Sequence, residues 1–472
     1  MSPKLAYRWR WAALTALLAA EAMNLLDATI VQVAAPVIHA DLAGPASDIQ
    51  WFGAAYTLPF AVLLITGGRL GDIAGRTRTF RVGVAAFVIA SLACALSGSA
   101  GTLIAARAVQ GAAAALIIPQ TLGLIRAMFH GAELPKALGT IGPVMGLSAV
   151  CGPVLGGLLT HADLLRSSWR SVFLVNVPLG LAVLALTPLL REDRAAHRPR
   201  LDLPGTTLAT FGTGMVVYPL IEGDTAGRWI VLAGGVVVLV MFWFQQRGRS
   251  RRGRTPLIEA SLFGNRGFPA ALMSSTLFFA VMNGLMLTIV LQAQLARHDD
   301  VLTSGLMLLP WSGGMAVSSW VSGAYLFPRF GAKLMYGGLT ALLTGTLLLL
   351  ATYTLGYSWP AVPAMALGGL GLGMFTTPFF STALARVRPH EIGSAAGLLN
   401  AVQQLGGTLG IALLGTLFLR TGAALTGLWA AGALVIATGF ATKFMIGGRP
   451  QDADQAGTGT AAASVTSPAS TP

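Results

Sequence analysis

The sequence predicts an all-α membrane protein that crosses the bilayer many times. Of its 472 residues, 54% are hydrophobic and only 10% are charged, whereas an ordinary soluble domain has roughly 45–50% apolar and 25% charged residues. Apolar runs of about 20 residues recur along almost the whole chain, and each is long enough to cross a hydrocarbon core roughly 30 Å thick as a helix. A soluble enzyme is therefore disfavoured, and the net charge of +13 is interpreted as loop charge rather than as a nucleic-acid surface.

The apolar runs, bounded by charged residues or by clusters of Gly, Pro, Ser and Asn, predict fourteen transmembrane helices. In chain order they cover residues 11–36, 51–70, 80–98, 101–125, 138–161, 170–190, 204–221, 229–246, 268–292, 303–325, 334–355, 360–383, 393–418 and 424–446.

The distribution of basic residues supports this count, because cytoplasmic loops carry most of the Lys and Arg residues of a membrane protein. One set of alternate connections holds 25 of the 31 basic residues, the opposite set holds 5, and Arg107 lies within a helix. An odd number of helices would mix the two sets. Both termini are therefore expected in the cytoplasm.

Several classes of site find little support in the sequence. Cys94 and Cys151 are the only cysteines, and both lie in apolar runs, so neither a disulfide framework nor a multi-Cys metal site is expected. None of the lysines completes a phosphate-binding loop, and no nucleophile elbow of the G-x-S-x-G type is present. We expect no enzymatic activity, no cofactor and no ATP motor on this chain, so any active transport must draw on an ion gradient or on a partner.

The connection between the second and third predicted helices has an unusual composition, GRLGDIAGRTR over residues 68–78. Anchoring of the topology would explain its arginines, but not Asp72 with its glycines, which let helix ends approach closely. The segment resembles the loop signature of the major facilitator superfamily, except that Ile73 and Thr77 stand where a basic residue is usual. The resemblance favours a conformational latch formed by Gly68, Asp72, Gly75 and Arg76.

Further segments resemble the drug:proton antiporter branch of this superfamily that has fourteen helices. In the first helix, LDATIVQVAAP over residues 26–36 follows the branch pattern, with Gln32 in place of the usual Asn. The sixth helix resembles the branch from Trp169 to Gly180. The fourth helix matches the one that carries a buried arginine, at Leu103, Arg107, Gln110 and Gly111. The fifth matches the antiporter motif at Gly139, Gly152, Pro153, Gly156 and Gly157, with Ser148 replacing one glycine.

The resemblance implies the major facilitator fold, in which two six-helix bundles are joined here by two inserted helices. The N-terminal bundle is expected over residues 1–190, the inserted helices with their cytoplasmic loops over 191–266, and the C-terminal bundle over 267–448. Residues 449–472 are small and polar, without apolar periodicity, and predict a disordered cytoplasmic tail.

Three ionisable residues fall inside predicted membrane helices, where such residues are costly and mark functional sites. Glu21 and Asp27 lie about 120° apart on the first helix with Asn24 between them, so a polar arc is expected to face a cavity. Asp27 and Arg107 both lie roughly 10–14 Å below the outer surface and can meet. Opening that contact would let the carboxylate take up a proton, which couples protonation to conformation. Carboxylates that serve only helix association, and an Arg107 that reaches the outer interface, are the alternatives.

The predicted substrate cavity uses uncharged polar side chains, which suit ligand hydrogen bonds or simple helix contacts. The C-terminal bundle has no Asp or Glu within its apolar spans, so proton carriage is expected in the N-terminal bundle. The candidate cavity residues are Asn24, Gln32, Gln110, Asn283, Gln292, Asn400 and Gln404.

Together, the resemblance and the buried acids predict a proton-coupled exporter of amphipathic drugs or antibiotics in a bacterial plasma membrane. We expect a monomer that uses the proton gradient and binds no nucleic acid. Acids on the first helix favour a cationic substrate, although protonation would neutralise them before it arrives. A proton-linked importer of a small metabolite with the same fold, and a membrane sensor that transports nothing, are the alternatives.

Overall fold

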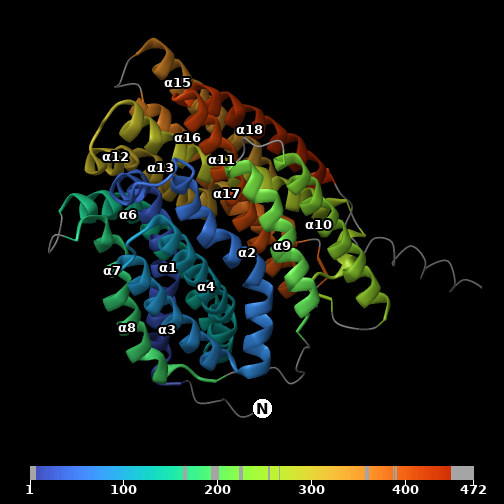
Figure 1. Cartoon of the computed structure of the whole chain (residues 1–472). Coiled ribbons are helices and arrows are strands. Elements are labelled where there is room, and N and C mark those ends of the chain that lie inside the picture. The colour runs from blue at the N-terminus through green and yellow to red at the C-terminus, as the bar shows by residue number, and fades with distance from the viewer. Residues whose placement is uncertain are drawn as a thin grey trace, which may run out of the picture.

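The structure is a bundle of helices, most of which run side by side through the length of the molecule (Figure 1). It is a computed structural model, and it describes residues 7–162, 167–192, 201–222, 227–252, 256–264, 266–356, 361–385, 387–388 and 391–447. Within these ranges the regular structure is entirely helical. The predicted tail, residues 449–472, lies outside the described residues.

The first part of the chain forms the helices of the N-terminal bundle. They are α1 (Arg10–Leu42), α2 (Asp48–Ala74), α3 (Arg76–Ala95), α4 (Ala100–Met128), α5 (Glu133–Gly139), α6 (Ile141–His161), α7 (Ser171–Leu174) and α8 (Asn176–Leu186). The predicted fifth and sixth helices are each divided, and proline explains both breaks. Pro143 and Pro178 have no N–H to offer the carbonyls four residues earlier, which belong to the last residues of α5 and α7.

The remaining helices form the inserted pair and the C-terminal bundle. The inserted pair consists of α9 (Leu203–Ile221) and α10 (Arg228–Arg251). The C-terminal bundle consists of α11 (Gly267–Leu291), α12 (Val301–Met307), α13 (Leu309–Val321), α14 (Phe327–Phe330), α15 (Leu334–Leu355), α16 (Ala361–Leu384), α17 (Ile392–Thr421) and α18 (Ala424–Gly447).

Twelve helical segments of the described chain are long and apolar enough to cross a membrane. One of them, Val301–Leu355, has 55 residues and would extend roughly 80 Å as a single helix, well over the roughly 30 Å of a hydrocarbon core. The chain turns within it at Gly331, where φ is +57°, so this segment supplies two crossings. The less apolar α9 supplies a further helix of 19 residues. Helices are thus found at all fourteen predicted ranges.

The two bundles share an apolar core at only one end of the molecule. There, Ile30, Phe52 and Trp169 belong to the same buried cluster as the interior of the C-terminal bundle. The end that carries Arg10 and Arg76, here called the Arg-rich end, has a separate core built almost wholly from α1 to α8. The bundles are therefore joined most tightly at the end opposite the Arg-rich end.

The inserted pair lies along one side of the molecule, with α9 next to α2 and α17 (Figure 1). Near the Arg-rich end, the hydroxyls of Thr66 on α2 and Thr206 on α9 are 2.9 Å apart. Near the opposite end, Thr416 of α17 donates a hydrogen bond to the Leu220 carbonyl at 2.8 Å. The helix α9 therefore contacts both bundles.

A buried carboxylate fixes the start of α9 against α10. Asp202 accepts hydrogen bonds from the Gly205 amide at 3.0 Å, from Gln245 at 3.1 Å and from Gln246 at 2.7 Å. Arg249 Nε lies 3.3 Å from the same carboxylate. Burial by itself raises the pKa of Asp202, but the hydrogen bonds from Gln246, Gly205 and Gln245 and the charge of Arg249 lower it below its usual range.

The same contact region continues into the segment between α10 and α11. Gln246 Oε1 accepts the amides of Leu257 at 2.5 Å and Ile258 at 3.2 Å, and Arg69 of α2 donates to the Pro256 carbonyl. The inserted pair and the segment that follows it are therefore attached to the Arg-rich end of α2.

We predict that Asp202→Asn destabilises the protein at pH 7 by about 1–3 kcal/mol, because buried donors lose their charged acceptor. Since the folded-state pKa of Asp202 is lowered, its stabilisation is complete above the unfolded pKa near 4 and is lost as the pH falls through the folded pKa. Thermal unfolding in detergent at pH 7 and at lower pH measures this, and the gap between variant and wild type should narrow in acid. A gap that does not change with pH would contradict the prediction.

Candidate functional site

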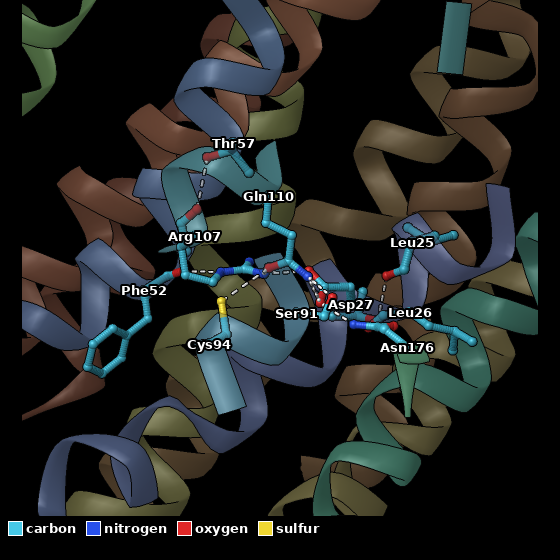
Figure 2. A network of polar contacts seen from close by, with 12 residues as sticks. Leu25, Leu26, Asp27, Phe52, Thr57, Ser91, Cys94, Arg107, Gln110 and Asn176 are labelled. Carbon is cyan, nitrogen blue, oxygen red and sulfur yellow. Dashed lines mark hydrogen bonds and ion pairs between the residues drawn. The ribbon is translucent and has the colours of Figure 1, made fainter. Parts of the chain in front are cut away.

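A buried ion pair joins α1 to α4 inside the N-terminal bundle. Asp27 Oδ2 lies 2.5 Å from Arg107 Nη1, and both side chains are at most 1% exposed. The other carboxylate oxygen of Asp27 accepts hydrogen bonds from Gln110 at 2.8 Å and from Asn176 of α8 at 2.7 Å (Figure 2). Both oxygens of the buried carboxylate therefore have partners, which makes its charge tolerable away from water.

The guanidinium of Arg107 is held by α2 as well as by Asp27. Its Nε donates to the Phe52 carbonyl at 2.9 Å, and its Nη1 donates also to Gln110 Oε1 at 2.7 Å. The Tyr56 ring covers it, with Arg107 Cζ 4.3 Å from the ring centroid. This contact needs the close approach of α2 and α4 at Gly111, where a Cβ atom would collide with the Tyr56 carbonyl.

Gln110 extends the network to α3. Its amide nitrogen donates to Ser91 Oγ at 2.8 Å, and the Cys94 thiol lies 3.7 Å from its oxygen. The network thus connects α1, α2, α3, α4 and α8 (Figure 2). We call its six side chains the Asp27 hub: Asp27, Arg107, Gln110, Asn176, Ser91 and Cys94.

The contact between Asp27 and Arg107 confirms what their depths in the sequence indicate, while its functional role stays a prediction. The prediction of one polar arc facing a cavity was wrong for Asp27, which is fully buried because its partners lie on α4 and α8. Gln110 is also fully buried within the hub and does not line a cavity in this structure. Glu21 is half-buried and takes no part in the hub.

The predicted cavity amides have different surroundings. Gln32 Nε2 lies 3.3 Å from Asn283 Oδ1 and so connects α1 to α11 across the two bundles. Gln292 accepts the Ala424 amide at 3.0 Å and so caps the start of α18. Asn400 and Gln404 are half-buried on α17.

The glycines of the antiporter motif place α6 between the two bundles. A Cβ atom on Gly152 would collide with Thr29 of α1, and one on Gly157 would lie 2.8 Å from the carbonyl of Val301, the first residue of α12. A Cβ atom on Gly156 would lie 2.9 Å from the Ile30 carbonyl oxygen of α1. Gly139 differs, because it ends α5 and a Cβ there would meet no atom within 4 Å. Close packing therefore explains the second half of the motif and not its first glycine.

The predicted latch residues lie where α2 meets α3. Asp72 and Arg76 form an ion pair of 2.9 Å across Gly75, whose φ of +102° suits glycine. Glu192, at the end of the first bundle, accepts the Thr77 amide at 3.3 Å and so caps α3. Gly68 faces Pro119 of α4. Asp72 therefore holds the neighbouring helix start within the N-terminal bundle.

Sequence reasoning missed four members of this region: Ser91, Cys94, Asn176 and Tyr56. Single small polar residues in an apolar helix are common, so Ser91 and Cys94 carry no signal of their own. Their spacing of three residues, which puts both on one face of α3, is the pattern that points to a polar neighbour. No group of three His, Cys, Asp or Glu side chains in the described part of the chain is arranged to hold a metal ion.

Comparison with known proteins gives the family of the chain. The sequence profile of the Major Facilitator Superfamily matches residues 17–411. The chain belongs to this superfamily. Two solved peptide transporters have the same fold: a POT variant in complex with alafosfalin (TM-score 0.66, 15% identity, 92% of this chain and 96% of that one) and an auto-inhibited POT family transporter (TM-score 0.64, 16% identity, 91% and 96%).

Several relatives of higher identity come from Streptomyces species. The superfamily member is 44% identical over 423 residues to the probable actinorhodin transporter of Streptomyces coelicolor, covering 87% of this chain and 73% of that protein. It is 38% identical to the puromycin resistance protein pur8 of Streptomyces alboniger, covering 86% and 81%. It is 34% identical to the tetracenomycin C resistance and export protein of Streptomyces glaucescens, covering 86% and 76%.

We predict strong energetic coupling between Asp27 and Arg107. Asp27→Asn and Arg107→Ala should each destabilise the protein by about 3–5 kcal/mol, because each leaves a buried charge without its partner. The double variant should lose clearly less than the sum of the two. Thermal unfolding of the four proteins measures the coupling. The partly exposed pair of Arg10 and Glu133, 2.8 Å apart with side chains 16% and 40% exposed, is the control, with a coupling below about 1 kcal/mol. Equal coupling in both pairs would contradict the prediction.

Proposed function

We propose that this protein is a secondary active exporter that expels amphipathic drugs or antibiotics in exchange for protons that move inward. The observation that carries the proposal is the Asp27 hub, in which an acid and a base are buried together between helices of a transporter fold. Such a pair is costly in an apolar bundle and marks a functional site.

The hub supports proton coupling through its charge balance. The positive charge of Arg107 stabilises a carboxylate placed beside it. If the two helices separate, the carboxylate loses its counter-charge in an apolar setting and binds a proton instead. Protonation and helix position are therefore linked, which is the property that an exchange of protons for substrate requires.

The substrate class rests on the relatives, which are named for the transport, export or resistance of antibiotics. In this chain, a substrate would meet the half-buried amides of Asn400 and Gln404 and the contact between Gln32 and Asn283, which lies between the bundles. We propose that residues 1–190 and 267–448 are the two moving units and that the protein acts as a monomer in a bacterial plasma membrane. The Arg-rich end and both termini would then face the cytoplasm.

The decisive test is Asp27→Asn. Asparagine keeps the size and much of the hydrogen bonding of Asp27 but cannot exchange a proton, so proton-driven export should be lost while some substrate binding remains. Uptake of ethidium and of puromycin into everted vesicles, which is the export direction, together with proton release or uptake on substrate addition by the purified protein, measures both. Equal proton movement in wild type and variant would remove Asp27 as the carrier. Substrate accumulation in the importing direction would instead favour a proton-linked importer.

We predict that Asp72→Asn slows export with little change in substrate affinity, because Asp72 holds Arg76 at the start of α3 and stabilises one conformation. The initial rate of export and the equilibrium binding of substrate separate these two effects. If turnover were unchanged, the connection between α2 and α3 would serve only to orient the helices in the membrane.

We predict that reporters fused near Arg191 and Arg252 lie in the cytoplasm and that a reporter near Asp299 lies outside. The reason is the excess of basic residues at the first two positions. Alkaline phosphatase and green fluorescent protein fusions distinguish the two sides. If the reporters near Arg191 and Asp299 shared a side, the proposed orientation of the fourteen helices would fail.

A further inference from the structure

The part of α2 that holds Arg107 also faces the other bundle. Arg107 Nε donates to the Phe52 carbonyl at 2.9 Å, and the Tyr56 ring covers the guanidinium. Residues 52 and 56 are four apart, so they lie on one face of α2. Gly53 and Thr57 have the same spacing and lie on the adjacent face, because successive residues of a helix are about 100° apart.

That adjacent face of α2 packs against α17 of the C-terminal bundle (Figure 1). The hydroxyl oxygens of Thr57 and Thr408 are 2.7 Å apart, and both residues are buried. One helical turn away, a Cβ atom on Gly53 would lie 3.3 Å from Ile411 Cδ1, so the two helices are in close contact there as well. The segment 52–57 of α2 therefore contacts the Asp27 hub on one face and the C-terminal bundle on the next.

The same segment lies at the boundary between the two apolar cores. Phe52 belongs to the buried cluster that both bundles share. Tyr56 and Phe60 belong to the separate cluster at the Arg-rich end. A motion that separates the Arg-rich ends of the bundles would therefore pivot near residues 52–57 of α2.

The contact with Phe52 ties Arg107 to the position of α2 itself. The acceptor is a backbone carbonyl, which moves only with the helix, whereas a side chain could follow the guanidinium by changing its rotamer. The backbones of α2 and α4 also approach closely, since a Cβ atom on Gly111 would collide with the Tyr56 carbonyl. A displacement of Arg107 is therefore passed on as a shift of α2.

The contact between Thr57 and Thr408 can open and close at little cost. Each hydroxyl has a second acceptor on its own helix: the Gly53 carbonyl lies 3.2 Å from Thr57 Oγ1, and the Gln404 carbonyl lies 2.9 Å from Thr408 Oγ1. Threonine hydroxyls in helices commonly bond to the carbonyl three or four residues earlier. Neither hydroxyl is thus left unpaired when the two helices part.

We propose that the Thr57–Thr408 contact couples the protonation of Asp27 to the relative position of the two bundles. The proposal rests on the proposed function, because it assumes that Asp27 exchanges protons. While Asp27 is ionised, Arg107 is held between the carboxylate and α2, and α2 lies against α17. When Asp27 takes up a proton, its attraction for Arg107 is lost, α2 shifts with the guanidinium, and the two hydroxyls part. Thr57 and Thr408 are positioning residues that act through Arg107.

The ion pair and the threonine contact are formed together in this structure. The Thr57–Thr408 contact therefore stabilises the conformation in which Asp27 is ionised. Without the contact that conformation is less populated, and Asp27 takes up a proton at a lower proton concentration. Loss of either hydroxyl should then move proton binding to higher pH.

The titratable groups around Asp27 are the same in wild type and in threonine variants. Four helices bring titratable or charged side chains to this part of the bundle: Glu21 of α1, Tyr56 of α2, Cys94 of α3 and Arg107 of α4. Among the other helices packed on α1, α6 brings no acidic or basic side chain before His161, and α7, α8, α11 and α12 bring none. A shift of the pH profile in a Thr57 or Thr408 variant therefore reports on the contact between the bundles.

The experiment compares Thr57→Val and Thr408→Val with wild type in proteoliposomes that contain the full chain, with ethidium and puromycin as substrates. Valine is β-branched like threonine and lacks only the hydroxyl. Loss of an interhelical hydrogen bond in a membrane protein changes an equilibrium by about two- to tenfold. The pH midpoint of export should therefore rise by about 0.3–1 unit in each variant, with substrate affinity within about twofold of wild type.

Three control variants test whether the hydroxyl contact itself is responsible. Thr57→Ser keeps a hydroxyl and should restore the wild-type profile. Thr66 of α2 lies 2.9 Å from Thr206 of α9 through the same pair of atoms, so Thr66→Val removes a similar contact that does not involve α17, and it should leave the midpoint unchanged. The double variant of Thr57→Val and Thr408→Val should shift the midpoint no further than either single variant, because both break one contact.

The outcomes separate this proposal from the proposed function. If wild type exchanges no protons on addition of either substrate, the proposed function itself fails. If wild type exchanges protons and both valine variants keep its pH midpoint, only the proposed coupling is overturned, even if the variants are less stable. A shift in Thr57→Val with none in Thr408→Val would equally overturn it, because the contact needs both hydroxyls. Loss of substrate affinity without a shift would make these residues substrate contacts and would also overturn it.

Discussion

The burial of Asp27 with Arg107 is the constraint on which the N-terminal bundle depends. Two opposite charges in an apolar interior stabilise the folded protein only if they pair with each other and their remaining hydrogen-bonding groups also have partners. Five helices supply the charged groups and their partners. The helix α1 carries Asp27, and α4 carries both Arg107 and Gln110. The other three helices contribute Asn176 from α8, Ser91 from α3 and the Phe52 carbonyl from α2. A shift of any one helix leaves a buried polar group without its partner, so the hub ties the positions of these helices to the charge of Asp27.

The same construction recurs at Asp202, outside the first bundle. This buried carboxylate is also held by glutamine amides and an arginine, and it fixes the start of α9 against α10. Through Gln246 and Arg69 the contacts continue to α2, whereas Thr416 of α17 reaches α9 near the opposite end. The inserted pair is therefore bound to the N-terminal bundle at the Arg-rich end and to both bundles at the other end. Relative motion of the bundles at the Arg-rich end would carry α9 and α10 with α2.

The contact between the bundles depends on small side chains. At Gly152 and Gly157 the absence of a Cβ atom lets α6 lie against α1 on one side and α12 on the other. The apolar core is continuous across the bundles at that end and separate at the Arg-rich end. Packing is thus strongest where the glycines are, and a rigid-body motion that separates the Arg-rich ends would disturb the fewest buried contacts. The Asp27 hub lies in the bundle that such a motion would displace.

The sequence by itself determined the helical class and the fourteen helix ranges, which follow from apolar length and loop charge and do not depend on how the helices pack. The superfamily followed from the resemblance of its motifs, and depth along the helices indicated that Asp27 and Arg107 could meet. The tertiary structure decided which way each polar residue faces. Asp27 and Gln110 point into the N-terminal bundle, Gln292 caps α18, and Gly139 packs against no neighbouring helix. The sequence does not specify these positions, because they depend on neighbours far away in the chain.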